Sequence, residues 1–270
     1  SGRLAIITGI PGHGKSELVD YLVAKLNIRH KWKAAYFTPE NYPLKFHYAK
    51  MFEKLIGKKF GKNTTTELEW DMAFDYIRSN FWYIMDEDDF TVNSILESAK
   101  VLVRSRGVKT IVIDPYNKLE HKYNDSETQY ISRFLDQLTR FAKINDVLVI
   151  LVAHPRKMNK DASGRFEVPN LYDISGSSHF FNKTDYGISV YRKAEDGNSG
   201  LSNTVDIYFQ KIKFKHLGKI GTVTLDYDYI SGRFNKGGRD LSNWLVPEVQ
   251  DIIIEQTEFN YETKNEEAPY

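Results

Sequence analysis

The sequence predicts an α/β fold in which a central, mainly parallel and twisted sheet is flanked by helices on both faces. Apolar strand-like segments alternate with amphipathic helical segments along the chain, as expected when a helix connects each strand to the next. The opening strand, residues 4–8, runs directly into a glycine-rich turn and then into a helix that starts at residue 16. Several strands are apolar throughout, which indicates burial on both faces of the sheet.

The remaining elements follow with short connections. Apolar residues at three- and four-residue spacing predict helices over residues 16–26, 44–56, 67–79, 92–104 and 129–145. Short apolar runs predict further strands over residues 34–37, 81–85, 110–114 and 147–153.

The C-terminal part of the sequence is rich in β-forming residues. We expect strands over residues 186–192 and 206–214, then a hairpin over 223–227 and 232–234, which together form an antiparallel extension of the sheet. These elements predict one domain over residues 1–254. The acidic, polar residues 255–270 predict a disordered tail.

Composition excludes several classes of protein. The 270 residues include no cysteine, which rules out disulfides, thiol catalysis and thiolate metal sites. The net charge is only +1, so any contact with nucleic acid is expected to be local, as in a single loop. The lack of cysteine suits a reducing cytoplasm, where we expect the protein. The sequence shows no membrane-spanning apolar run and no leader, and because it opens with Ser1-Gly2 rather than Met we expect neighbouring domains outside it.

Residues 9–16 read Gly-Ile-Pro-Gly-His-Gly-Lys-Ser and match the phosphate-loop pattern G-x-x-x-x-G-K-[ST]. Glycines let backbone N–H groups turn inward on phosphates, and the following helix adds the positive end of its dipole. Lys15 is predicted to reach the β- and γ-phosphates of ATP, and Ser16 to bind Mg²⁺. An ordinary glycine-rich turn is the alternative, disfavoured by the strand before it and the helix after it. The residues predicted to bind the nucleotide are Gly9, Pro11, Gly12, His13, Gly14, Lys15, Ser16 and Glu17.

Polar residues follow three of the predicted strands. Asp114 ends the strand 110–114 and is a candidate to hold Mg²⁺ through water, although an aspartate here also suits a turn. Glu40 follows the second strand, where a carboxylate close to the first strand is a candidate general base; a solvated or capping glutamate is equally compatible. His154 follows the strand 147–153 and is a candidate sensor of the γ-phosphate, with a solvated histidine as the alternative.

A basic, glycine-containing loop continues directly from His154. It carries Arg156, Lys157, Lys160 and Arg165, whose charges predict a grip on the phosphate backbone of nucleic acid. A plain solvated loop fits the same pattern.

Together these residues resemble the motor domain of DnaB-type replicative helicases, in particular the branch of phage primase-helicases and mitochondrial Twinkle. The resemblance extends from residue 4 to about 234. The phosphate loop, TPE at 38–40, IVID at 111–114 and VAH at 152–154 occur in the order of that family. Two later stretches make the match more specific: SGSS at 175–178 with NKTDYG at 182–187, and KIKF at 211–214 with GKIG at 218–221.

The resemblance implies a RecA-like fold and a homo-hexameric ring around single-stranded DNA, with ATP and Mg²⁺ between subunits and 5′–3′ translocation. It implies that Glu40 is the catalytic base and His154 the phosphate sensor. It further implies a fused or associated primase, and a bacterial or phage-infected cell as the setting. Because the primase-like region and linker of the family are absent here, the chain by itself is expected to be monomeric.

The resemblance also assigns Lys211 and Lys213 to a segment that reaches the nucleotide of the neighbouring subunit. The family usually has arginine where Lys213 stands, and lysine lacks the planar fork of that residue. Arg192 and Arg233 are therefore candidates to compensate. The spacing of Lys211 and Lys213 also fits the solvated face of a strand.

Two other functions share the phosphate loop. A RecA-type recombinase or clock-type ATPase would bind DNA or form filaments without unwinding. A P-loop kinase for a small molecule would need an arginine-rich lid and an acceptor pocket, and the β-rich C-terminal region argues against it.

Overall fold

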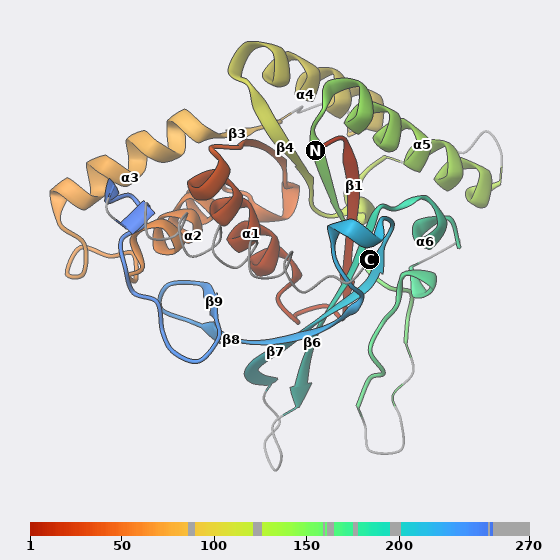
Figure 1. Cartoon of the computed structure of the whole chain (residues 1–270). Coiled ribbons are helices and arrows are strands. Elements are labelled where there is room, and N and C mark those ends of the chain that lie inside the picture. Colours follow the sequence, from red (N-terminus) through yellow and green to blue (C-terminus); the bar gives the residue numbers. More distant parts are fainter. Residues whose placement is uncertain are drawn as a thin grey trace.

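The computed structural model describes residues 1–85, 90–120, 126–158, 160, 165–174, 178–194, 201–247 and 249–250. The expected end of the domain at residue 254 and the expected tail over 255–270 lie outside these residues. Helices lie between successive strands up to β6, as the sequence predicted (Figure 1).

The helices are α1 (Lys15–His30), α2 (Lys45–Ile56), α3 (Glu67–Asn80), α4 (Val92–Arg106), α5 (Glu127–Asn145) and α6 (His179–Lys183), with short 3₁₀ turns η1 (Pro39–Asn41), η2 (Tyr116–Lys118), η3 (Leu171–Asp173) and η4 (Lys215–Leu217). The strands are β1 (Arg3–Gly9), β2 (Lys33–Phe37), β3 (Phe81–Tyr83), β4 (Val108–Ile113), β5 (Leu148–Val152), β6 (Tyr186–Ala194), β7 (Leu201–Ile212), β8 (Gly221–Asp228) and β9 (Arg233–Asn235). The expected elements are present, although α1 ends four residues later and β7 begins five residues earlier than the sequence indicated. The short helix α6 was not expected.

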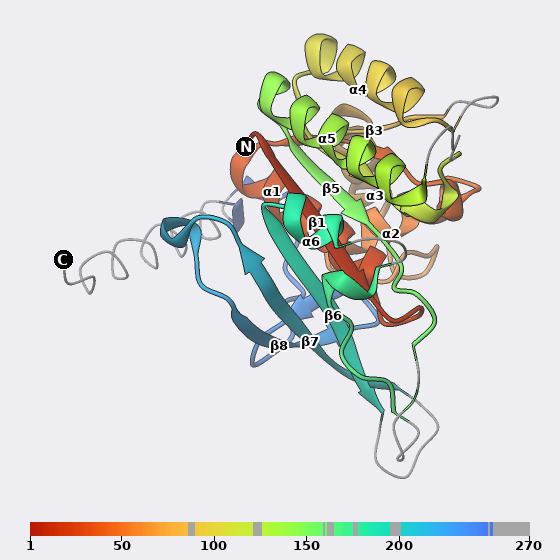
Figure 2. The same ribbon diagram turned by 90° about the vertical axis from the view of Figure 1, so that its right-hand side faces the viewer.

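The strands of the described residues form one sheet in the order β3-β2-β4-β5-β1-β6-β7-β8-β9. Neighbours from β3 to β6 pair in parallel, and those from β6 to β9 pair antiparallel. Figure 2 shows the antiparallel strands β6, β7 and β8 extending from this parallel part. The carboxyl ends of β1, β2, β4 and β5 therefore meet at one edge of the sheet, where α/β proteins bind their ligands.

The strands before Glu40 and His154 differ in their distance from β1. The strand before Glu40 is β2, which is separated from β1 by β4 and β5. In contrast, β5, which leads to His154, pairs directly with β1 through Ile7 opposite Val152.

The two faces of the sheet are covered by different helices. Alternate residues of a strand point to opposite faces, so Leu4 and Ile6 join the layer of α4 and α5, whereas Ala5 and Ile7 join the layer of α1, α2 and α3 (Figure 1). All four residues are buried. Each fully buried Leu or Ile side chain contributes about 1.5–3 kcal/mol to stability, so burial on both faces holds β1 firmly in the sheet.

The C-terminal strand is fastened to α2 by Arg233, whose side chain is fully buried. Its guanidinium donates hydrogen bonds to the carbonyl oxygens of Lys54 at 2.8 Å and Leu55 at 3.2 Å, which belong to the last turn of α2. It also forms an ion pair with Asp240 at 3.2 Å and lies 3.8 Å from the centre of the Trp244 ring. Arg233 therefore satisfies carbonyl groups that a helix end leaves without partners. Its burial corrects the suggestion that it compensates for Lys213.

No helix among the described residues combines the length and the apolar character that a membrane span requires.

Candidate active site

The phosphate loop joins β1 to α1, and two of its glycines are required by the backbone. Gly9 has a φ of +153°, and a Cβ there would collide with the carbonyl oxygen of Val190 in β6. Gly14 has a φ of +89° at the N-cap of α1, a left-handed conformation that side chains disfavour. The loop can thus pass close to β6 and still present the N-terminus of α1 to a ligand.

Lys15 lies in the first turn of α1 and is buried. Its Nζ donates hydrogen bonds to the carbonyl oxygens of Gly9 at 2.9 Å and Ile10 at 3.1 Å. Burial lowers the pKa of Lys15 to about 8, and the carboxylates of Asp114 and Glu40 partly oppose that effect. The side chain therefore remains a cation at neutral pH, within the loop that would hold phosphates.

Ser16 and Asp114 form the second part of the site. Asp114 follows β4 and is buried, and this burial raises its pKa to about 6, with further increases from Asp20 and Glu40. A hydrogen bond from the Ser16 hydroxyl and the charge of Lys15 act in the opposite direction. A hydroxyl and a carboxylate beside a phosphate loop are oxygen ligands suited to Mg²⁺, which uses few protein ligands together with substrate phosphates. The described residues contain no cluster of three or more acidic or histidine side chains that would hold a metal by themselves.

One cavity is lined both by the phosphate loop and by residues that follow β2 and β5. Its volume is about 520 Å³. Its lining residues are Pro11, Gly12, Gly14, Lys15, Ser16, Glu17, Glu40, Lys50 and His154. Three of the predicted site segments therefore meet, although β2 is not a neighbour of β1 in the sheet.

Glu40 lies in η1 with a side chain that is 48% exposed, and its Oε1 is 3.8 Å from the Nζ of Lys118. That separation is long for an ion pair between exposed groups, which contributes little stability. Glu40 thus faces the cavity with its carboxylate accessible to solvent, as a residue that activates water must be.

His154 also lines the cavity, and its backbone N–H donates to Oδ1 of Asn117 at 3.2 Å. Burial lowers the pKa of His154, and the positive charges of Lys15 and Lys118 lower it further against the opposing effect of Glu40. The imidazole is therefore neutral at pH 7, with one ring N–H to donate. Its Nδ1 is buried without a hydrogen-bond partner among the described residues.

His13, predicted to bind the nucleotide, turns its side chain away from the cavity. Its Nδ1 accepts a hydrogen bond from the backbone N–H of Arg192 at 3.0 Å, and its ring lies 5.3 Å from that of Tyr191. Burial lowers the pKa of His13 to about 4, and the charges of Lys15 and Arg192 contribute in the same direction. A neutral His13 therefore ties the phosphate loop to β6.

The backbone bond to His13 places Arg192 beside the phosphate loop of the same chain. Its guanidinium donates to the carbonyl oxygen of Ser202 at 2.7 Å and to the hydroxyl of Tyr229 at 2.7 Å. These contacts place it on β6 next to His13, far along the sheet from Lys211 and Lys213.

Glu17 lines the cavity but is surrounded by cationic and hydroxyl groups of the same chain. It pairs with Lys54 at 2.6 Å and Lys50 at 3.0 Å, and accepts a hydrogen bond from Tyr227 at 3.2 Å. Burial would raise the pKa of Glu17, but the two ammonium groups hold it down at about 2. Lys50 was missed by the sequence reasoning, because a lysine within a helical pattern is typical of a solvated face.

Lys211 and Lys213 lie near the start of β1, at the opposite edge of the sheet from the phosphate loop. The register places Ala5 beside Tyr186 and Tyr186 beside Ile212, whereas Gly9 pairs with Val190. Lys211 donates to the carbonyl oxygens of Phe181 at 2.6 Å and Asn182 at 3.0 Å, in α6. Neither lysine can therefore reach the phosphate loop of its own chain.

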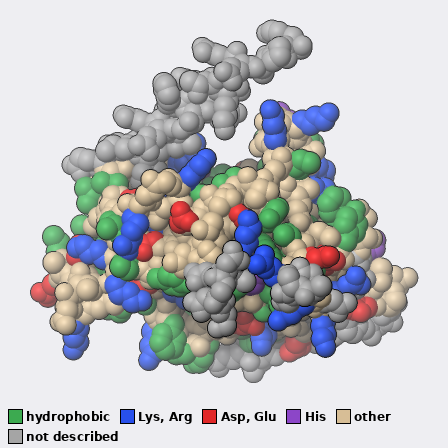
Figure 3. Space-filling model, turned by 90° about the horizontal axis from the view of Figure 1, so that it is seen from below, with side chains coloured by type: hydrophobic (Ala, Val, Ile, Leu, Met, Phe, Trp, Pro, Cys, Tyr) green, Lys and Arg blue, Asp and Glu red, His purple; other side chains and the backbone are tan. Residues whose placement is uncertain are grey.

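The predicted DNA-contact loop is only partly described, since residues 159 and 161–164 lie outside the described part. Arg156, Lys157, Lys160 and Arg165 are all exposed. The backbone N–H of Arg156 donates to the carbonyl oxygen of Asp173 at 2.7 Å, which fixes the start of the loop. Figure 3, seen from below, shows Lys and Arg side chains of the described residues interspersed with Asp and Glu on this side of the molecule.

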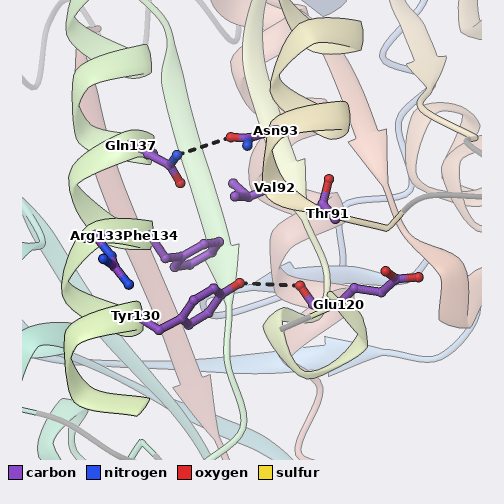
Figure 4. Close-up of a pocket in the computed structure, with 8 residues that line it drawn as sticks. All are labelled: Thr91, Val92, Asn93, Glu120, Tyr130, Arg133, Phe134 and Gln137. Carbon is purple, nitrogen blue, oxygen red and sulfur yellow. Dashed lines mark hydrogen bonds between the residues drawn. The ribbon is translucent and has the colours of Figure 1, made fainter. Parts of the chain in front are cut away.

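A second cavity, of about 460 Å³, lies between the start of α4 and α5 (Figure 4). Gln137 donates to Asn93 at 3.1 Å and the Tyr130 hydroxyl to the carbonyl oxygen of Glu120 at 3.4 Å across it. The residues described as lining it are distinct from those that line the phosphate cavity.

The sheet order, the glycine loop, the buried Lys15 and the Ser16–Asp114 pair define a P-loop nucleotide-binding domain with a RecA-like fold. The chain matches the family described as the DnaB-like helicase C terminal domain over residues 1–236, and it belongs to this family. It is similar to two solved structures that share this fold. One is an ATPase domain, with a TM-score of 0.70 and 23% identity over 87% of this chain and 85% of that one. The other is a DnaB-like replicative helicase, studied with its primase interactions, with a TM-score of 0.69 and 22% identity over 87% of this chain and 58% of that one.

Two proteins of known sequence are also similar to this chain. The Twinkle homolog protein, chloroplastic/mitochondrial, of Arabidopsis thaliana is 37% identical over 245 residues, which cover 87% of this chain and 34% of that protein. A probable plasmid replicative DNA helicase of Chlamydia muridarum is 23% identical over 248 residues, covering 87% of this chain and 51% of that protein. The chain thus spans about a third and about half of the lengths of these relatives.

Proposed function

We propose that this chain is the ATP-hydrolysing motor domain of a replicative DNA helicase, which moves along single-stranded DNA and separates duplex. The observation that carries the proposal is that the phosphate loop, Glu40 and His154 line one cavity. Membership of the DnaB-like family and the 37% identity to a Twinkle homologue support the same function.

In the proposed reaction, Lys15 and the N-terminus of α1 hold the β- and γ-phosphates. Ser16 and Asp114 would hold Mg²⁺, which neutralises charge that develops on the phosphate oxygens. Glu40 accepts a proton from a water molecule that attacks the γ-phosphorus in line, and the bond to the β-phosphate oxygen breaks to leave ADP. His154, neutral at pH 7, donates its ring N–H to a phosphate oxygen and loses that partner when phosphate leaves.

The position of His154 suggests how turnover is passed to DNA. It stands immediately before the basic loop that begins at Arg156, and that loop is anchored to Asp173. We propose that a shift of His154 moves the loop along the phosphate backbone of single-stranded DNA. In a homo-hexamer, six such loops would act in turn, with Lys211 and Lys213 directed at the neighbour's nucleotide.

Partners and location remain proposals of the same kind. A primase is an expected partner because the solved DnaB-like helicase interacts with one. The name of the Arabidopsis relative gives an organellar location for that protein, so the cytoplasmic location expected from sequence stays a prediction.

The deciding experiment measures ATP turnover with and without single-stranded DNA, together with strand displacement from forked duplexes carrying a 5′ or a 3′ tail. We expect DNA to stimulate turnover and the 5′-tailed fork to be unwound. Turnover stimulated by DNA without any unwinding by the full-length protein would favour a recombinase-like or clock-type ATPase. Turnover that DNA leaves unchanged at every salt concentration would contradict a DNA motor and favour a kinase.

A further inference from the structure

The helices α1 and α2 are joined by a row of polar contacts beside the phosphate cavity. His47, Lys50 and Lys54 occur at intervals of three and four residues and so share one face of α2. They meet Glu17 and Asp20, three residues apart on α1: His47 Nε2 lies 2.9 Å from Asp20, Lys50 Nζ 3.0 Å and Lys54 Nζ 2.6 Å from Glu17. This row fixes α2 against the helix that begins with the phosphate-binding residues.

Within this row, Lys50 makes a contact that His47 and Lys54 do not show in the described part of the chain. Its Nζ also donates to Oδ1 of Asn41 at 3.3 Å, and Asn41 in turn donates from Nδ2 to the Thr38 hydroxyl at 2.7 Å. Asn41 follows Glu40 directly in the turn η1. Lys50 therefore bridges α1, through Glu17, and the turn that carries the proposed base.

Lys50 and Glu17, which form the bridge to α1, both remain charged over a wide range of pH. Burial would lower the pKa of Lys50, but the Glu17 carboxylate, with help from Asp20 and Asp114, raises it above its ordinary value. The pKa of Glu17 is held at about 2. The Lys50 side chain is 35% exposed, so the pair is partly shielded from solvent while its Nζ still reaches the cavity.

Among the described residues, Glu40 has little else to hold it. Its carboxylate is 48% exposed, and the contact with Lys118 at 3.8 Å is weak. The backbone N–H of Asn41 donates to the Thr38 carbonyl oxygen at 3.1 Å, which closes the turn that carries Glu40. The link that Lys50 makes between Asn41 and α1 would therefore set the distance between Glu40 and the phosphate loop.

We propose that Lys50 is a positioning residue for ATP hydrolysis, which holds the Glu40 turn in register with the phosphate loop through Asn41 and Glu17. This inference rests on the proposed function. Lys50 acts through Glu40 and Asn41 and need not touch the nucleotide, since its Nζ is already engaged by Glu17 and Asn41 within hydrogen-bond distance. Removing it should therefore slow the chemical step more than it weakens nucleotide binding.

The test uses the full-length protein and the variants Lys50→Met, Lys50→Arg, Asn41→Ala and the double variant Lys50→Met/Asn41→Ala. Lys58→Met is the matched control, because Lys58 also forms an ion pair of 2.6 Å, with Glu69, but lies away from the cavity. The kcat and KM for ATP are measured by steady-state turnover, nucleotide affinity by titration with a fluorescent ADP analogue, and folding by thermal melting.

We expect Lys50→Met to lower kcat by about tenfold or more while KM and ADP affinity change by less than about threefold, since small misplacements of a catalytic group are costly. Lys50→Arg should recover most of the loss. Asn41→Ala should lower kcat in the same way, and the double variant should be no slower than Lys50→Met, because both changes break the same link.

A Lys50→Met protein with the kcat of the Lys58→Met control would overturn the inference while leaving the proposed function intact. A rise in KM and a loss of ADP affinity, additive with Asn41→Ala, would also overturn it and assign Lys50 to direct contact with phosphate. Absence of ATP turnover in the folded parent protein would overturn the proposed function and this inference together.

Discussion

The Nζ of Lys213 lies 3.1 Å from Oδ1 of Asp185, a buried carboxylate whose Oδ2 accepts the backbone N–H of Leu4 at 3.1 Å. This pair sits at the start of β1, so Lys213 and the phosphate loop occupy opposite ends of the same strand. In the proposed homo-hexamer, a cation in that place would serve a nucleotide held by another subunit. Asp185 is buried, so its carboxylate is costly to leave without a cation even though Oδ2 keeps the backbone partner.

We therefore expect Lys213→Ala to preserve nucleotide binding by each chain and to abolish turnover in the assembled ring. Losing a cation at the transferring phosphate typically costs about 10³-fold or more in rate. The check is a complementation experiment, in which Lys213→Ala protein is mixed with Lys15→Ala protein. Each variant alone should be inactive, whereas mixed assemblies contain sites where an intact Lys15 meets a neighbour's intact Lys213, so turnover should reappear. No recovery in mixed assemblies would show that Lys213 has no role at a neighbour's site.

Glu40→Gln should separate binding from hydrolysis. The amide keeps the size of the side chain but cannot accept the proton of the attacking water, so we expect turnover to fall by about 10²–10⁴-fold with nucleotide affinity nearly unchanged. Pre-steady-state release of phosphate and equilibrium binding of ATP measure the two effects. Glu97→Gln on α4, where the side chain is 75% exposed, is the control. Turnover at the parent rate in Glu40→Gln would assign the base to another residue.

Much of the fold followed from local sequence patterns. The short apolar runs around Ile111 and Ile150 predicted strands buried on both faces, and the glycines of the phosphate loop indicated where β1 ends. The order of the strands could not be obtained in this way, because it depends on long-range pairing. Two strands thus separate β1 from β2, which precedes Glu40, although Glu40 still lines the cavity of the phosphate loop.

The site was predictable where a residue's chemistry is tied to a motif, and less so where it depends on packing. Lys15 and Ser16 could be assigned from spacing alone. Three features depend on side chains that meet across the fold: the contact of His13 with β6, the burial of Arg233 and the bridge made by Lys50. A single sequence carries no local signal for such contacts.

Asp114→Asn should stabilise the nucleotide-free protein while it impairs Mg²⁺-dependent turnover. Burial raises the pKa of Asp114 from its ordinary value of 3.8 to about 6, so the folded chain binds this proton more tightly than the unfolded chain does. The protonated Asp114 side chain therefore contributes favourably to the free energy of unfolding at low pH, and this contribution is lost as the pH rises from about 4 to about 6. Asparagine removes the buried charge and can still accept the Ser16 hydrogen bond.

We expect thermal melting at about pH 7.5 to show a Tm for Asp114→Asn about 2–4 °C above wild type, with the difference vanishing near pH 4. Asp136→Asn, on α5 with a carboxylate 58% exposed, controls for loss of a surface charge. A lower Tm for Asp114→Asn at the higher pH would show that ion pairing with Lys15, rather than desolvation, dominates the free energy of this carboxylate.

The paired change Arg156→Ala and Lys157→Ala should weaken binding of single-stranded DNA in a way that depends on salt. Each phosphate contact on a single strand adds about 0.7 to the magnitude of the slope of log K against log salt, so losing two contacts should flatten the slope by about 1.4. The pair Lys100→Ala and Arg104→Ala on α4 removes the same charge from a helix that does not border the phosphate cavity and should leave the slope unchanged. Fluorescence anisotropy with an oligothymidine across a salt series measures both, and DNA-free ATP turnover should be unaffected in either protein. Equal slopes for the Arg156/Lys157 variant and wild type would mean that other residues bind the DNA. A shift of His154 could then not be passed to the DNA strand through this loop.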